Sequence, residues 1–426
     1  MKNYDQFIKD FSALIGAKSV QTEKVDGAPF GEGVAKAYSV FKNICNKMGF
    51  DVIDYDGYIG EVYFPSDGNC EGEPFGVIGH LDVVPAEGDW NTPPFTLTLK
   101  DGVFYGRGVQ DDKGPTLACL YAVKELLDEG YKFKRPLRFI IGLNEESGWQ
   151  DVDYFLTKST FPKEGFSPDG NFPVTYAEKG VYRVVVSIPY KGSATNISGG
   201  TVVNAVCDYA SASVKIDDTL IKKHCLKVAD DGRVESFGKS AHGAKPHLGK
   251  NAIRGLLAYI SDLDGGVFDN VVKGLFDDGL GIFKIASEVG SVTISPNKIK
   301  QTDSGVELLC DLRIPAKVDV KTVLNALDNL GEKYTLISSR DPHYVEKNGA
   351  LVQGLLSAYN KVTGENAEPY SCAGATFASV FKSGVAFGPE FEGEDGAIHE
   401  PNEYIKEETL LKCFAIYKEA LKTILC

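Results

Sequence analysis

Two short apolar segments of this chain each lead directly into a side chain that can bind metal or carry protons. Residues 76–79 run into His80, and residues 137–143 end just before Glu145. Between them, residues 115–129 place apolar side chains at helical spacing, after a Gly-Pro start and before a closing glycine. Apolar runs of this kind are typical of parallel strands that helices cover on both faces. We therefore predict an α/β domain in which the carboxyl ends of the strands carry the functional residues.

The sequence pattern changes in the middle of the chain. After Tyr176, segments such as residues 182–188 alternate in a way that predicts half-buried antiparallel strands. A helical pattern resumes at residues 351–359, and His399 follows it, so the first domain must be built from both ends of the chain. The predicted architecture is a mixed, largely parallel sheet flanked by helices, the catalytic domain, formed by residues 1–177 and 346–426, with an inserted α+β lid domain at residues 178–345.

Composition limits the cellular locations and the classes of binding partner that we expect for the chain. Its 426 residues exceed what one hydrophobic core usually supports, which agrees with two domains. The net charge of −14 and the pI of about 5.0 argue against a nucleic-acid or anionic-membrane partner, because both favour basic surfaces. The first residues lack a signal-peptide pattern, and no apolar run approaches the length of a membrane span. The nine cysteines include no C-x-x-C pair, so we expect reduced thiols and a cytoplasmic location.

Imidazole and carboxylate side chains recur at the ends of the predicted elements, in a set that suits a pair of divalent cations. Such cations take histidine nitrogens and carboxylate oxygens, and two ions about 3.5–4 Å apart usually share a bridging carboxylate. Each residue alone has an ordinary explanation as a helix cap, a turn or a charged loop. Their joint occurrence in one domain favours the metal hypothesis. The candidate ligands are His80, Asp111, Glu146, Asp169 and His399.

Two pairs of adjacent acidic residues each leave a choice of roles. Either Asp111 or Asp112 could sit at the tip of a tight loop and bridge both ions, and we prefer Asp111. Adjacent residues of an extended chain point in opposite directions, so one carboxylate can bind metal while its neighbour carries protons. We assign Glu146 as the ligand and Glu145 as the general base. Asp82 can lie behind the imidazole that precedes it and fix the orientation of that ring.

In this order, the motifs resemble the co-catalytic di-zinc peptidase family that includes aminoacylase-1, carboxypeptidase G, carnosinase and succinyl-diaminopimelate desuccinylase. Residues 106–115, 144–149 and 385–403 are most similar to the monomeric bacterial dipeptidases. The resemblance covers essentially the whole chain. It implies two divalent ions, with zinc expected, although manganese or cobalt would accept the same ligand types.

The resemblance also implies a role for each candidate of the first domain. Asp82 would be the partner of His80, and Glu145 would be the general base. The peptide bond that joins Asp111 to Asp112 would be cis. One ion would be held by His80 and Asp169 and the other by Glu146 and His399, with Asp111 bridging the two.

From the inserted domain, the resemblance implies residues that contact the substrate. The family pattern maps onto residues 240–243, where His242 would polarise the scissile carbonyl, and His247 is the nearby alternative. Asn204 and Arg313 would bind the carbonyl or the terminal carboxylate of the substrate. A planar guanidinium suits a carboxylate because it donates two parallel hydrogen bonds.

One loop departs from the family pattern. Residues 372–379 occupy the place of a Gly-Gly-Thr-Tyr-Ala-Arg-like loop, and Phe377 and Ser379 stand where the dipeptidases have Tyr and Arg. The departure bears on side-chain selectivity and leaves the metal ligands intact. Gly374 and Thr376 of this loop are the remaining candidates for substrate binding.

Together these features predict a metal-dependent dipeptidase that hydrolyses dipeptides with a free amino terminus by a water activated by two metal ions. The expected partner is a small peptide, without nucleic acid or membrane. The long inserted domain resembles that of dipeptidases in which an extra lobe replaces a second subunit, so we expect a monomer. An N-acyl-amino-acid amidohydrolase or desuccinylase would use the same chemistry, and a non-catalytic peptide-binding protein is the alternative from a different class.

Overall fold

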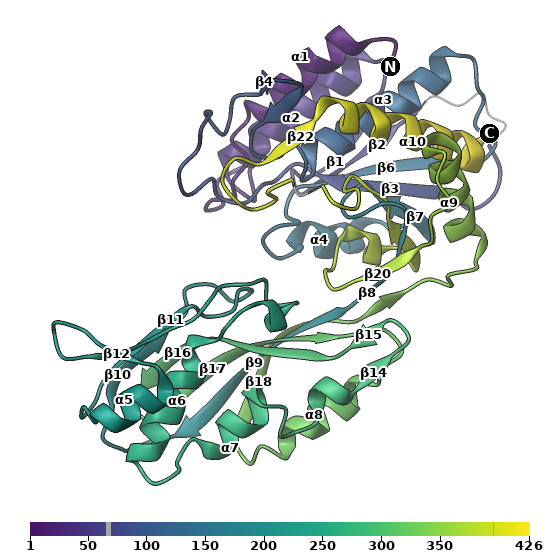
Figure 1. The fold of residues 1–426 in the computed structure, drawn as a ribbon. Helices are drawn as coiled ribbons and strands as arrows, with labels where there is room; N and C mark the ends of the chain where they lie inside the picture. Colours follow the sequence, from purple (N-terminus) through teal and green to yellow (C-terminus); the bar gives the residue numbers. More distant parts are fainter. Residues whose placement is uncertain (65–69, 395) are drawn as a thin grey trace. The chain divides into compact units, whose positions relative to one another are not determined.

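The computed structural model describes residues 1–64, 70–394 and 396–426, and the chain divides into two compact units (Figure 1). The first unit comprises Met1–Tyr176, Tyr344–Tyr370 and Thr376–Cys426. The second unit comprises Ala177–His343 together with Ser371–Ala375.

A mixed sheet forms the centre of the first unit. Its strands β6, β3, β7 and β21 run parallel, and β1, β2 and β8 pair antiparallel on either side of them. The predicted mixed sheet is therefore confirmed, with the parallel strands at its centre. In sheet order the strands are β1 (Asp51–Tyr55), β2 (Ile59–Tyr63), β6 (Leu137–Gly142), β3 (Phe75–His80), β7 (Glu164–Ser167), β21 (Ser383–Ala386), β8 (Thr175–Glu178) and β19 (His343–Tyr344), and β20 (Tyr370–Cys372) pairs with β8.

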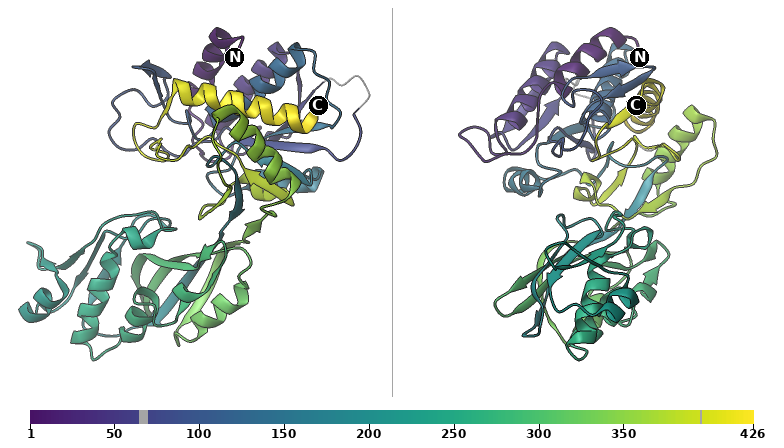
Figure 2. Two further views of the ribbon diagram at one scale, coloured as in Figure 1. Left: turned by 45° about the vertical axis from the view of Figure 1, so that its right-hand side comes forward. Right: turned by 60° about the vertical axis from the view of Figure 1, so that its left-hand side comes forward.

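Helices cover both faces of this sheet (Figures 1 and 2). On one face lie α1 (Tyr4–Ile15), α2 (Glu32–Lys47), α3 (Lys113–Asp128) and α10 (Glu407–Leu425), with α9 (Ala350–Thr363) against α10. On the other face, α4 (Gln150–Lys158) and the short helix η4 (Phe377–Val380) pack against the strands through Ile78, Ile140, Phe155 and Phe377. α3 begins earlier than the predicted residue 115, because the carbonyl of Asp112 already accepts a hydrogen bond from the backbone N–H of Thr116 (3.0 Å).

A small second sheet of the first unit joins segments that are far apart in the sequence. Strand β5 (Val103–Tyr105) lies between β4 (Thr98–Lys100) and β22 (Tyr404–Lys406). In the register of β5 with β22, Tyr105 faces Tyr404. This pairing brings the residues before β22 next to the loop that leads into α3.

An antiparallel sheet with helices on one face makes up the second unit (Figure 1). Burial alternates along β9 (Gly180–Pro189), as the pattern of residues 182–188 predicts. The buried face packs with α6 (Ala252–Leu263) and α8 (Val320–Asp328) in one hydrophobic cluster, which confirms the α+β composition. In sheet order the strands are β12 (Lys227–Val228), β13 (Val234–Phe237), β11 (Tyr209–Ser213), β10 (Thr195–Gly199), β16 (Thr293–Thr302), β17 (Gly305–Ile314), β9 and β18 (Lys333–Arg340). The remaining elements are α5 (Asp218–His224), η1 (Pro246–Leu248), α7 (Asp269–Val271), η2 (Val272–Phe276), η3 (Ile282–Lys284), β14 (Ala286–Ser287) and β15 (Gly290–Ser291).

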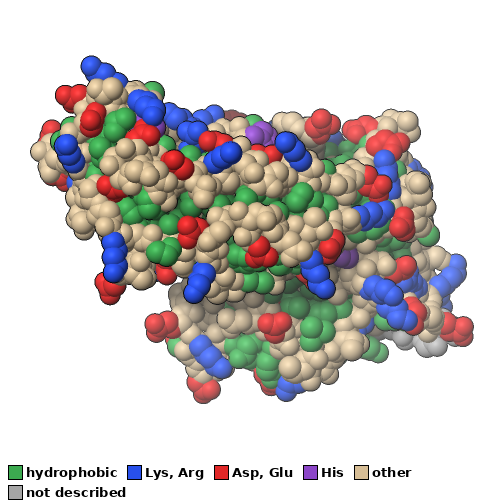
Figure 3. Space-filling model, turned by 90° about the horizontal axis from the view of Figure 1, so that it is seen from below, with side chains coloured by type: hydrophobic (Ala, Val, Ile, Leu, Met, Phe, Trp, Pro, Cys, Tyr) green, Lys and Arg blue, Asp and Glu red, His purple; other side chains and the backbone are tan. Residues whose placement is uncertain are grey.

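The surface charges, the cysteines and the helices bear on the environment and the partners of the chain. Acidic and basic side chains are interspersed over the face drawn in Figure 3, with hydrophobic ones between them. All nine cysteines are free thiols. Among the helices of the described ranges, none is both long enough and apolar enough to cross a membrane.

Candidate metal centre

The candidate ligands of the first unit gather at one edge of its parallel strands. His80 is the last residue of β3, Glu146 follows β6, and Asp169 follows β7. Parallel strands end at the same edge of a sheet, so these loops converge there. The other two candidates come from loops: Asp111 precedes α3, and His399 lies between β21 and β22.

Asp111 lies between the two histidines and presents one oxygen to each. Its Oδ1 is 3.0 Å from His80 Nε2, and its Oδ2 is 2.9 Å from His399 Nε2. Burial opposes ionisation of Asp111, but hydrogen bonds from His399 and His80 outweigh it and hold the pKa of this carboxyl below its usual range. A carboxylate in this position can bind two cations at once.

The other candidates surround this carboxylate. His399 Nε2 is also 3.1 Å from each carboxylate oxygen of Glu146, and His80 Nε2 is 3.8 Å from Asp169 Oδ2. Ligand atoms of His80, Asp111 and Glu146 lie within 4.8 Å of one another, and so do those of His80, Glu145 and Asp169. The structure thus brings together all the predicted ligands and Glu145.

Asp111 and its neighbour Asp112 face different surroundings. The peptide bond between them is cis, as the resemblance implies. Asp112 Oδ2 accepts hydrogen bonds from the backbone N–H of His80 (3.2 Å) and from Thr116 Oγ1 (2.7 Å), so it ties β3 to α3. Gly79 allows this contact, because a β-carbon there would lie 1.8 Å from Thr116 Oγ1. The geometry favours Asp111 over Asp112 as the bridging residue.

Asp82 contacts three residues of the candidate site and fixes their positions. Its Oδ1 is 3.4 Å from His80 Nδ1, although the backbone carbonyl of Asp82 is closer to the same nitrogen (3.0 Å). The carboxylate of Asp82 also accepts hydrogen bonds from the backbone N–H groups of Glu145 and Glu146, both at 3.0 Å. Asp82 therefore orients one imidazole and, at the same time, the two neighbouring glutamates.

Glu403 is a supporting residue to which sequence reasoning gave no role. This fully buried carboxylate accepts hydrogen bonds from Arg107 Nη1 (2.9 Å) and from the backbone N–H groups of Gly108 (3.0 Å), Gln110 (3.0 Å) and Asp111 (3.2 Å). It holds the loop that carries Asp111. The one available signal was its place in the His-Glu-Pro-Asn-Glu segment, four residues after His399.

The carboxylates of the cluster are short of positive charge. Burial raises the pKa of Glu145 to about 8 and holds the pKa of Asp169 well above its usual range, and repulsion from the nearby carboxylates adds to both shifts. Burial and Asp111 raise the pKa of Glu146 to about 7. Grouped acids of this kind ionise fully only when cations join them. Imidazole nitrogens and carboxylate oxygens are also the donors that zinc-type ions prefer, so the residues fit a divalent metal centre.

The candidates of the second unit come from two loops and one strand: Asn204 lies between β10 and β11, His242 lies between β13 and η1, and Arg313 belongs to β17. The backbone N–H of Gly243, next to His242, donates to the carbonyl of Asn204 (2.6 Å). Arg313 is buried and donates to both oxygens of Asp311 (2.8 and 3.0 Å) and to the carbonyl of Ala373 (3.1 Å). Binding of a substrate carboxylate by Arg313 stays a prediction, because these partners already occupy much of its guanidinium.

The remaining loop candidates have local contacts. The carbonyl of Gly374 accepts from Cys372 Sγ (3.6 Å). Thr376 Oγ1 caps η4 by accepting from the backbone N–H of Ala378 (3.1 Å). Phe377 is fully buried, with its ring 6.2 Å from that of His80, so it packs beneath the cluster. His247, the alternative to His242, lies in η1.

Residues 76–423 match the model of peptidase family M20/M25/M40, and the chain belongs to this family. The predicted family resemblance is thereby confirmed. The chain is 30% identical to "Putative dipeptidase YtjP" of Bacillus subtilis, over 99% of this chain and 97% of that protein. Its fold is similar to human carnosine dipeptidase 1, with a TM-score of 0.61 and 16% identity over 99% of this chain and 96% of that one. It is also similar to Bacillus subtilis YxeP, described as a dinuclear metal binding peptidase, with a TM-score of 0.54 and 11% identity over 99% and 98% of the two chains.

Proposed function

We propose that this chain is a metal-dependent dipeptidase that hydrolyses dipeptides with a free amino terminus. Membership of the peptidase family supports hydrolysis of an amide bond, and the similarity to the Bacillus subtilis protein named as a dipeptidase supports dipeptides as substrates. The observation that most supports metal dependence is the position of Asp111. Its two carboxylate oxygens each lie at about hydrogen-bond distance from a different histidine.

The proposed centre takes two divalent ions, and zinc is the ion that we favour. His80 and Asp169 would hold one ion, Glu146 and His399 the other, and Asp111 would be shared. When bound, the ions would supply Lewis acidity for activating water and polarising the scissile carbonyl. The dinuclear centre named for YxeP supports this stoichiometry.

Glu145 is the proposed general base. Its backbone is held by Asp82, and its carboxylate oxygen lies within 4.8 Å of ligand atoms of His80 and Asp169. Glu145 would take a proton from the water that attacks the peptide carbonyl carbon. It would then give this proton to the amine that leaves when the C–N bond breaks, so that each turnover yields two amino acids and restores the carboxylate.

Residues of the second unit complete the proposal. His242 would stabilise the negative charge that develops on the carbonyl oxygen, as a positioned donor does in other hydrolases. Asn204, Arg313, Gly374 and Thr376 would contact the substrate. The free cysteines support the cytoplasm as the location, and the resemblance to monomeric dipeptidases supports a monomer without nucleic-acid or membrane partners.

Substrate class and metal content test this proposal together. Purified protein should contain two divalent ions per chain and should cleave dipeptides. It should cleave N-acetyl and N-succinyl amino acids far more slowly, since a dipeptidase needs a free amino terminus. Preference for the N-acyl substrates would replace the dipeptidase by an amidohydrolase, and a chain that binds peptides but never cleaves them would overturn the enzyme assignment.

A further inference from the structure

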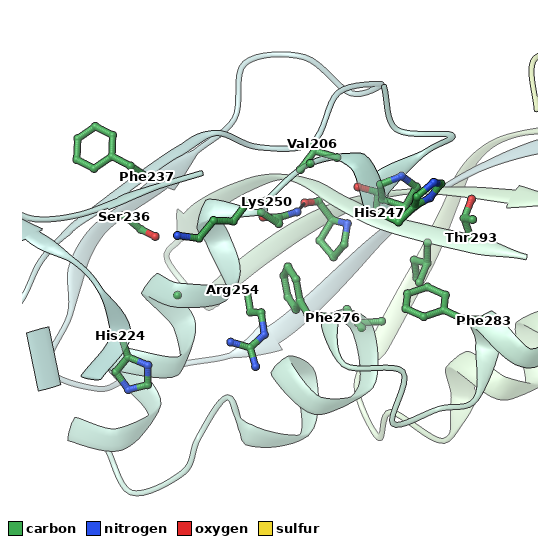
Figure 4. A pocket seen from close by; sticks show the side chains of 18 of the residues that line it. Val206, His224, Ser236, Phe237, His247, Lys250, Arg254, Phe276, Phe283 and Thr293 are labelled. Carbon is green, nitrogen blue, oxygen red and sulfur yellow. Dashed lines mark hydrogen bonds between the residues drawn. The ribbon is translucent and has the colours of Figure 1, made fainter. Parts of the chain in front are cut away.

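A cavity of about 690 Å³ lies wholly within the second unit (Figure 4). It is bordered by the first residues of β16, by the loop that precedes α6 and by η2 and η3. β10 pairs with β16 only through Ser198 and Gly199, so on this side the first half of β16 has no strand partner among the described pairings. The space beside that open edge is the cavity. Its volume falls within the range of about 300–1,000 Å³ that is usual for small-molecule sites.

The lining of the cavity is largely apolar. Phe276 and Phe283 come from η2 and η3, Ile294 comes from the start of β16, and Val292 directly precedes that strand. Figure 4 shows the two phenylalanine rings below the loop that carries Lys250 and His247. An aromatic or aliphatic group of a ligand would therefore be removed from water here, which favours binding by about 25 cal/mol per Å² of apolar surface buried.

The charged groups of the lining all have one sign. Lys223, Lys250 and Arg254 border the cavity, and none of its described lining residues is Asp or Glu. This contrasts with the net charge of −14 of the chain and with the mixed charges over the face in Figure 3.

Two of these three cations already have partners. Lys223 pairs with Asp262 (2.6 Å), and Arg254 donates to both oxygens of Asp277 (2.7 Å each). Lys250 forms no ion pair with any residue in the described ranges. One uncompensated cation beside an apolar wall suits a ligand with one negative charge and an apolar body.

We propose that this cavity is a binding site for a small amphipathic monocarboxylate, with Lys250 facing the carboxylate and Phe276 and Phe283 contacting the apolar group. The site shares no residue with the candidate metal centre. Its lining includes His247, the alternative to His242, but none of the residues to which the proposed function gives a role.

Calorimetric titration of the full-length, metal-containing protein tests the proposal with 4-phenylbutyrate as the probe. We expect one bound probe per chain and at least tenfold weaker binding of 4-phenylbutylamine, which has the same body and the opposite charge. Butyrate, which lacks the ring, should also bind at least tenfold more weakly. Lys250→Glu should reduce the affinity for 4-phenylbutyrate at least tenfold, and Phe276→Ser should do the same through the apolar wall.

Lys333→Glu is the matched control, because Lys333 is an exposed residue of β18 outside the cavity and the substitution changes the net charge equally. It should leave the affinity unchanged. Equal binding of the acid and the amine, no binding of 4-phenylbutyrate at millimolar concentration, or binding that survives Lys250→Glu would each overturn the proposal. The last result would place the probe elsewhere, for example on metal ions, and so separates this site from the metal centre.

Discussion

Replacing Glu403 by Gln removes the charge that holds the loop before α3, which carries Asp111. Gln has nearly the same shape, but its amide group offers one acceptor oxygen and turns an NH₂ toward groups that are donors. Arg107, with 1% of its surface exposed, then loses its ion-pair partner at 2.9 Å, and its Nε already has no hydrogen-bond partner among the residues that the structure describes. Breaking one side of a buried ion pair usually costs about 3–5 kcal/mol. We expect the free energy of unfolding of the first unit to fall by about this amount.

Intrinsic fluorescence can report this loss for the first unit alone. The chain has two tryptophans, Trp90 and Trp149, and both lie in the first unit. The Trp90 ring also lies 5.1 Å from the Arg107 guanidinium, so it is close to the perturbed loop. Urea unfolding followed by tryptophan emission therefore gives the free energy that the prediction concerns.

Glu400→Gln provides the control, because Glu400 is an exposed residue nearby and the substitution removes the same charge. This variant should unfold within about 0.5 kcal/mol of the parent protein, as surface substitutions usually do. If Glu403→Gln costs less than about 1 kcal/mol, the typical worth of a single hydrogen bond, then Glu403 does not hold the loop and our reasoning is refuted.

Three further predictions concern the candidate metal centre and its surroundings. Glu145→Gln should retain two metal ions per chain while dipeptide turnover falls by at least about 10²-fold, the usual contribution of a general base; near-normal turnover would exclude this role. His399→Ala should lose about one metal ion per chain by elemental analysis, whereas Glu400→Gln keeps both, and two ions in each variant would contradict the ligand assignment. Burial raises the pKa of Asp151 from 3.8 to about 7, so the folded state binds the proton more tightly than the unfolded state. The stability from this proton is complete below the unfolded pKa and is lost as the pH rises toward 7, so Asp151→Asn should flatten the decline in unfolding free energy between these pH values.

The parts of the fold that follow from local pattern were predictable from sequence. The apolar run before His80 and the one before Glu145 became β3 and β6, since buried parallel strands need continuous apolar residues on both faces. The meeting of their ends followed from the rule that parallel strands finish at one edge. His80 and Glu146 could be named for that reason, whereas Asp111, Asp169 and His399 were named from their joint occurrence and from the family resemblance.

The supporting contacts depended on pairings between remote segments, which a local pattern does not encode. A glutamate in a Pro-Asn-Glu loop is typically a solvated surface residue. Glu403 is buried because β22, which directly follows it, pairs with β5. The preference for Asp111 over Asp112 gains its geometric support from the contacts of Asp112 with the backbone N–H of His80 and with Thr116 Oγ1. The cavity beside β16 likewise results from where β10 stops pairing, which no composition or periodicity reveals.

The late position of β22 in the chain has a consequence for biosynthesis. A ribosome releases His80, Asp111, Glu146 and Asp169 first, then the whole second unit, and only afterwards His399 and Glu403. During that interval the nascent acidic cluster lacks both its second imidazole and the carboxylate that restrains its central loop. In the proposed centre, binding of both metal ions therefore has to wait for residues beyond the second unit, and translation that stops before His399 yields a product without the full set of candidate ligands.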